Sequence, residues 1–144
     1  MALPADYLGA APLIVERLRT AVPALRGVLL ADDLAALAER TAVGPLAFVI
    51  YDGDEVLEGD GRARQGASQM VRQRWAVIMA VRSAVQHRDG ALHQIAGPLL
   101  TAVIAALAGW HTPPYRAPLY RITAPRVDYG PNFALYPLLF AGDF

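Results

Sequence analysis

The stretch from Ala91 to Trp110 constrains the fold most strongly, because it carries an unbroken helical pattern of apolar residues. The spacing i, i+3, i+4 predicts one apolar helix face made of Leu92, Ile95, Ala96, Leu99, Leu100, Val103, Ile104 and Leu107. The opposite face is small, which would permit close approach of a neighbour, and consists of Gly97, Thr101, Ala105 and Ala108. We expect Pro98 either to kink this helix or to start its main segment with Gly97 as cap, and Gly109 to end it. So wide an apolar face needs another layer to cover it.

Two further helices are predicted. From about Ala10 to Val22 the apolar residues again follow a helical stripe, with Pro12 in the first turn and Pro23 at the end. Asp32 and Asp33 are typical of an N-cap and a first-turn acid, so they predict a short helix that continues to Arg40 and is broken by Gly44-Pro45.

Several apolar runs predict strands. Val28–Leu30 is a short candidate, Leu46–Tyr51 is typical of a strand with both faces covered, and Leu119–Thr123 alternates. Phe133–Phe140 is a final strand in which Pro137 indicates an edge position or a bulge.

The segment from Gln69 to Arg82 is compatible with either a helix or a strand. A helix would place Val71, Trp75, Ile78 and Met79 together. Alternation and β-branched residues favour a long strand, with one face formed by Val71, Trp75, Val77, Met79 and Val81 and the other bearing Arg72, Arg74, Ala80 and Arg82.

These elements together predict an α+β fold of two layers. We expect a mixed or mostly antiparallel sheet of four to five strands packed against two long helices and one short helix. A length of 144 residues fits one domain, so residues 1–144 are expected to fold together. Asp52-Gly53-Asp54 is predicted to turn the chain, and residues 52–68 to form an exposed hairpin or loop excursion.

Composition and charge exclude several classes of protein. The absence of cysteine excludes disulfides and thiolate metal sites. Neither a signal peptide nor a long apolar run is present, so we expect an intracellular protein outside the membrane. The 13 basic and 13 acidic residues cancel, which argues against a dedicated nucleic-acid binder. The hydrophobic fraction of 55% fits either apolar surface covered by a partner or an alanine-rich chain with a full core.

No pattern in the sequence predicts catalysis, a cofactor or a metal. The acids after Asp52 lack the glycine and glutamate of a calcium loop, and Gly59, Gly61 and Gly66 do not match a dinucleotide fingerprint. The histidines show no ligand pairing, and neither serine has a nucleophile-elbow context; these residues are His87, His93, His111, Ser68 and Ser83. We therefore expect a protein that is not an enzyme.

Opposite charges around the excursion are the one pattern that points to binding. Acidic residues come first and arginines follow, which makes nine candidate interface residues: Asp52, Asp54, Glu55, Glu58, Asp60, Arg62, Arg64, Arg72 and Arg74. They could pair within the excursion, pair with the next subunit of a head-to-tail ring, or remain solvated. All 13 basic residues are arginine, which codon bias in a GC-rich genome explains more simply than a demand for interfacial arginines.

The order of these elements resembles the tail terminator proteins of long-tailed bacteriophages. The resemblance spans nearly the full chain and includes the N-terminal helix PLIVERLRTAV, the strand LAFVIY after Gly44-Pro45, and a closing YPLLF strand. Its most specific parts are the segment QRWAVIMAVRS around Trp75 and the sequence LAGWHTP at Leu107–Pro113.

The resemblance implies a structural virion protein with no catalytic residues. In that family, subunits form a hexameric ring at the head-proximal end of the tail tube, stop tube polymerisation and offer the other face to a neck or stopper protein. It implies assembly in the host cytoplasm, a sheath as further partner if the tail is contractile, and DNA only as passing cargo. The alternatives are a head-completion or neck protein of the same virion, or a small binding module or enzyme whose site is not visible in sequence.

Overall fold

A computed structural model describes residues 3–31, 45–57, 70–83 and 90–144. Two helices and six strands occur among these residues. The helices are α1 (Ala10–Ala21) and α3 (Ala91–Leu107), and the strands are β1 (Gly27–Leu30), β2 (Leu46–Leu57), β3 (Met70–Arg82), β4 (Tyr120–Ile122), β5 (Asp128–Tyr129) and β6 (Phe133–Asp143). The predicted short helix of residues 32–40 lies outside the described part of the chain.

The strands form one mixed sheet in the order β1-β2-β3-β6-β4, with β5 also paired to β6. Only β1 and β2 are parallel, and all other pairs are antiparallel. The predicted mixed, mostly antiparallel sheet is therefore confirmed, but it has six strands rather than four to five. The additional strand, β5, is two residues long, too short for a period of two to reveal it in sequence.

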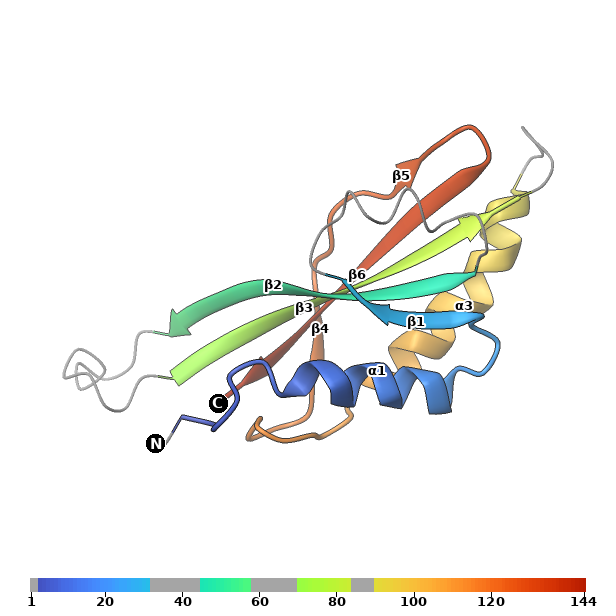
Figure 1. Cartoon of the computed structure of the whole chain (residues 1–144). Coiled ribbons are helices and arrows are strands. Elements are labelled where there is room, and N and C mark those ends of the chain that lie inside the picture. The colour runs from blue at the N-terminus through green and yellow to red at the C-terminus, as the bar shows by residue number, and fades with distance from the viewer. Residues whose placement is uncertain (1–2, 32–44, 58–69, 84–89) are drawn as a thin grey trace.

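Both helices pack on the same face of this sheet, which Figure 1 shows as a twisted sheet with α1 and α3 on one side. The helices also touch each other: the guanidinium Nε of Arg17 on α1 donates to the carbonyl of Ala106 on α3 at 3.0 Å. Arg19 donates to the carbonyl of Val28 at 2.9 Å, which satisfies a backbone group on the outer edge of β1.

Strand β3 resolves the ambiguity of Gln69–Arg82, because residues 70–82 form a strand whose alternation follows the predicted faces. Val71, Trp75 and Val77 point to the helices and are almost completely buried. On the other face, Ala76, Ile78 and Ala80 join Leu46 and Phe48 in a second, smaller apolar cluster. Residues 46–49 are accordingly buried on both faces of the sheet, as their continuous apolar run predicts.

The prediction that Asp52-Gly53-Asp54 turns the chain is wrong, because β2 continues through these residues to Leu57. Tyr51 pairs with Trp75 and Asp54 pairs with Gln73, so Asp52 and Gly53 together face Arg74. Gly53 has φ +95°, a left-handed conformation that glycine adopts at little cost. The segment is therefore a β-bulge rather than a turn.

Helix α3 departs from the prediction at Ile95 and decides between the two alternatives for Pro98. Ile95 is 39% exposed rather than buried, since the helix contacts the sheet along a narrower stripe than the apolar pattern covers. Pro98 lies inside the helix, so Gly97 is not its cap. The helix ends at Leu107, and Gly109 follows with φ +85°, as expected of a glycine just beyond a helix end.

The position of Pro137 also differs from the expectation of an edge strand or bulge. Strand β6 is interior, with β3 on one side and both β4 and β5 on the other. However, β5 pairs with residues 134–135 and β4 with residues 139–141, so Pro137 falls in the gap between them. A residue without an N–H fits there, because neither β4 nor β5 needs a hydrogen bond from it.

Candidate assembly surface

The predicted interface residues that the structure describes lie on two neighbouring strands. Asp52, Asp54 and Glu55 belong to β2, and Arg72 and Arg74 belong to β3. Figure 1 shows this part of the two strands extending past the end of β1. We call residues 52–57 and 70–74 the distal hairpin. The remaining candidates lie outside the described residues, namely Glu58, Asp60, Arg62 and Arg64.

One predicted pairing within the excursion is present. The Arg74 guanidinium lies 3.7 Å from the Asp52 carboxylate, and the two side chains are 37% and 47% exposed. A pair this open to water contributes about 0–1 kcal/mol to stability. This contact therefore ties the bulge to β3 without supplying much energy.

Arg72 pairs outside the excursion. Its guanidinium donates two hydrogen bonds to Asp143 at the end of β6, at 2.9 and 3.1 Å, and lies over the Tyr120 ring at 5.5 Å. The Tyr120 hydroxyl donates to the same carboxylate at 3.2 Å. These hydrogen bonds raise the pKa of the Arg72 guanidinium above its usual value. Arg72 thus holds β3, β6 and β4 together, a role that the charge pattern of the excursion did not predict.

A buried polar network lies under the base of the distal hairpin. The Trp75 indole N–H donates to the Tyr115 hydroxyl at 2.6 Å, and that hydroxyl donates to the side-chain oxygen of Gln73 at 2.7 Å. The Gln73 amide then donates to the carbonyl of Tyr7 at 2.7 Å. Burial raises the pKa of Tyr115 to about 12. Because each donor finds a partner, the network fixes the N-terminal segment and the 111–118 loop to β3.

The N-terminal segment is held at two further points. The Tyr7 hydroxyl donates to the Asp54 carboxylate, which the bulge places on the same sheet face as Tyr51. Desolvation and this hydrogen bond raise the pKa of Tyr7. The Tyr7 ring also packs edge-on against Phe144, with ring centroids 5.4 Å apart. Sequence reasoning missed Tyr7, Gln73 and Tyr115 because no local pattern links residues so far apart in the chain.

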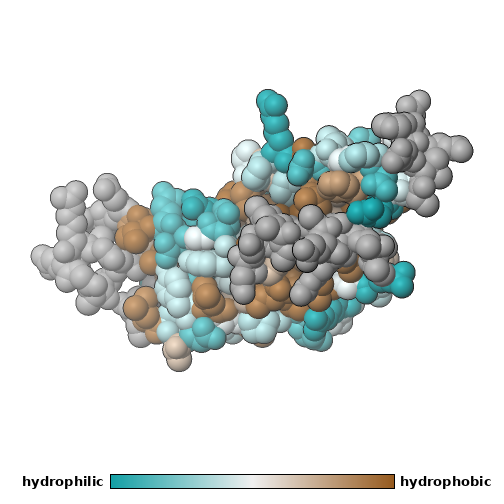
Figure 2. Space-filling view, turned by 45° about the horizontal axis from the view of Figure 1, so that its top comes forward, coloured by the Kyte–Doolittle hydropathy of each residue, from teal (hydrophilic) through white to brown (hydrophobic). Residues whose placement is uncertain are grey.

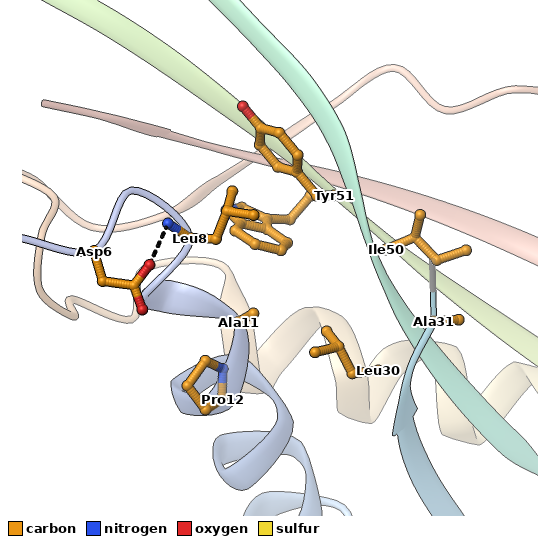
Figure 3. Close-up of a pocket in the computed structure, with 9 residues that line it drawn as sticks. Asp6, Leu8, Ala11, Pro12, Leu30, Ala31, Ile50 and Tyr51 are labelled. Atoms are coloured by element: carbon orange, nitrogen blue, oxygen red, sulfur yellow. Dashed lines mark hydrogen bonds between the residues drawn. The ribbon is translucent and has the colours of Figure 1, made fainter. Parts of the chain in front are cut away.

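A hollow of about 450 Å³ opens between the start of α1, the end of β1 and the middle of β2 (Figure 3). Its lining is mostly apolar and includes Leu8, Leu30 and Ile50. The one acidic side chain, Asp6, accepts the backbone N–H of Leu8 at 3.0 Å, so it stabilises the turn before α1. The lining thus offers apolar contact rather than a set of converging chemical groups.

The described histidines have structural partners. His93 lies 2.7 Å from the Tyr136 hydroxyl, and His111 lies 2.8 Å from the carbonyl of Tyr115. Within the described residues, no group of three histidine, aspartate or glutamate side chains is placed to hold a metal ion. His87 and Ser68 lie outside those residues.

The family model of the phage tail terminator protein matches residues 5–144, nearly the whole chain. The chain belongs to the phage tail terminator family. The suspected resemblance is therefore confirmed over almost its full extent. No curated protein matches the chain in sequence.

Membership of the tail terminator family supports a structural role in the phage tail, and with it a location in the virion and contact with other tail components. A structural family of this kind is consistent with a protein that is not an enzyme. In the described part of the chain, no helix combines the length and apolar character needed to cross a membrane.

Proposed function

We propose that six copies of this protein form a closed ring that caps the head-proximal end of the tail tube. The ring ends tube polymerisation and presents its other face to a neck or stopper protein during assembly in the host cytoplasm. The observation that carries this proposal is the match to the tail terminator family over residues 5–144. The six-fold number follows from the resemblance to that family, and a ring on a tube must share the rotational symmetry of the tube.

The surface of the subunit supports an assembly role. Apolar side chains remain exposed at Leu8 and Leu30, which line the hollow beside α1, and at Leu13 on α1 itself. Figure 2 shows hydrophobic side chains at the surface across the middle of the molecule, between hydrophilic regions. Scattered apolar residues are normal on a monomer, but several around one hollow are typical of a surface that a partner covers.

The predicted small face of α3 is also exposed, at Gly97, Thr101 and Ala105. Side chains of this size leave the helix backbone accessible to a neighbouring subunit. This face therefore provides a second candidate contact within a ring or between the ring and the tube.

A tube elongation assay tests this function. Tube protein is polymerised in the presence of its tape measure, and purified terminator is added while the tubes are growing. We expect growth to stop and each capped tube to carry added density at one end in electron micrographs. An equal amount of heat-unfolded protein is the control. Tubes that continue to lengthen at the control rate, with no added density, would contradict a capping role and favour a neck or head-completion protein.

A further inference from the structure

We propose that neighbouring subunits join edge to edge, with the distal part of β2 in one copy lying against β4 of the next copy. This inference rests on the proposed ring and specifies its subunit interface. The occupant of each sheet edge is a second copy of this chain. Three observations carry it: two open strand edges, their opposite charges, and their places at opposite sides of the sheet.

The first open edge is the outer side of β2 beyond residue 49, where pairing with β1 ends. Val56 pairs with Val71, whose N–H and C=O both bond to Phe144 on the far side of β3. Because both backbone groups of Val71 are bonded to Phe144, Val71 and Val56 form a non-hydrogen-bonded pair of the antiparallel ladder. The N–H and C=O of Val56 therefore point away from β3. The same alternation turns the backbone of Asp54 outward. No backbone partner for either residue occurs among the described residues.

The second open edge is the outer side of β4. Arg121 pairs with Phe140. Along β6 every second residue directs its N–H and C=O toward β3, and because Phe144 does so, Phe140 does so too. Arg121 therefore points its own N–H and C=O away from β6. The backbone of Leu119 is occupied by bonds with Gly109 and Trp110, but within the described chain no backbone bond reaches Arg121 on its outer side.

The two edges carry opposite charge. Acidic residues on the distal part of β2 include the exposed Asp54 and Glu55, neither of which forms an ion pair with any described residue. Across residues 111–127 the only charged side chains are arginines, and Arg121 and Arg126 are exposed without an ion pair in the described chain. Opposite charges on facing edges favour encounter of the two surfaces and set their register.

The two edges lie toward opposite sides of the sheet, since β2 and β4 are separated by β3 and β6 in the strand order. A contact between different surfaces of identical subunits is head-to-tail, and it closes into a ring when the rotation between subunits permits. Val56 is 49% exposed and Met70 38% exposed, so the acidic edge also offers apolar side chains to bury. Figure 2 shows hydrophobic side chains beside hydrophilic ones at this end of the molecule.

Charge reversal tests the interface. Glu55→Arg and Arg121→Glu are made singly and together, and the concentration at which half of the protein is in rings is measured by mass photometry, with tube protein present if the free protein is monomeric. At low salt we expect each single change to raise that concentration roughly ten-fold, because reversed rim charges repel and screening is weak. The double variant should return to within about three-fold of the unchanged protein, since the two facing edges again carry opposite charges, with the signs exchanged.

The matched control is Glu16→Arg with Arg26→Glu, which exchanges two exposed charges elsewhere on the subunit and leaves the net charge the same. It should leave ring formation unchanged. Thermal unfolding of every variant as a monomer checks that the fold is intact. Single reversals that behave like the control, or a double variant that is no better than either single one, would overturn the edge interface while leaving the ring in place.

A second pair of variants separates the contribution of the Val56 backbone N–H to ring formation from that of the Val56 side chain. Val56→Pro removes the outward N–H that the neighbour would use, whereas Val56→Ala keeps it. We expect Val56→Pro to abolish rings and Val56→Ala to weaken them only slightly, both with folded monomers. Equal ring formation by the two variants would overturn the backbone pairing. If the unchanged protein forms no ring in any condition, the proposed ring and this interface both fail.

Discussion

Replacing Trp75 with alanine is expected to lower the free energy of unfolding by about 3–5 kcal/mol. The Trp75 side chain is 1% exposed, and its ring centroid lies 5.1 Å from that of Tyr51. Its indole N–H donates to the Tyr115 hydroxyl. Truncation would leave a cavity between the sheet and the helices. It would also remove the hydrogen bond that the Tyr115 hydroxyl accepts, so the polar network under the distal hairpin loses one member.

Chemical unfolding followed by circular dichroism measures this change. Trp110→Ala is the matched control, because the Trp110 ring is only partly buried and lies beneath the Arg17 guanidinium at 5.6 Å. We expect the control to cost clearly less than Trp75→Ala. Equal losses for the two tryptophans would show that Trp75 is not a centre of the core.

Leu99→Ala is the second large effect, with an expected loss of about 2–5 kcal/mol. Leu99 lies on the inner face of α3 beside the fully buried Val103 and Leu107. Ile95→Ala is its control on the same helix, and since Ile95 is 39% exposed it should cost less than about 1 kcal/mol. The same measurement serves both variants. If Ile95→Ala lowers the free energy of unfolding more than Leu99→Ala does, Ile95 is buried as the sequence predicts. That result would contradict the packing of α3 described above.

The elements with a strong period could be predicted from sequence. The alternation of residues 70–82 predicted both the strand and its two faces, and the helical stripe predicted most of α3. Ile95 was misplaced because a periodic pattern gives the direction of the apolar face but not the width of the surface that covers it. Asp52-Gly53 was misread because a left-handed glycine serves a turn and a bulge equally well.

The contacts of the site could not be predicted in the same way. Arg72 was expected to pair within the excursion or with a neighbour, yet its partner Asp143 is 71 residues away in sequence. Tyr115 reaches Gln73 across 42 residues. These pairs exist because β6 returns beside β3 and the 111–118 loop closes over the sheet, and strand order carries no local signature. Charge pattern identified a region that bears exposed charges, whereas its partners depend on the topology.

The mass of the assembled protein tests the central proposal most directly. Mass photometry of the purified chain, alone and with tube protein, would report the number of copies in a particle, and electron microscopy of the same sample would report its symmetry. The proposal predicts closed particles of six copies with six-fold symmetry in at least one condition. A strictly monomeric or two-fold symmetric particle in both conditions would contradict it.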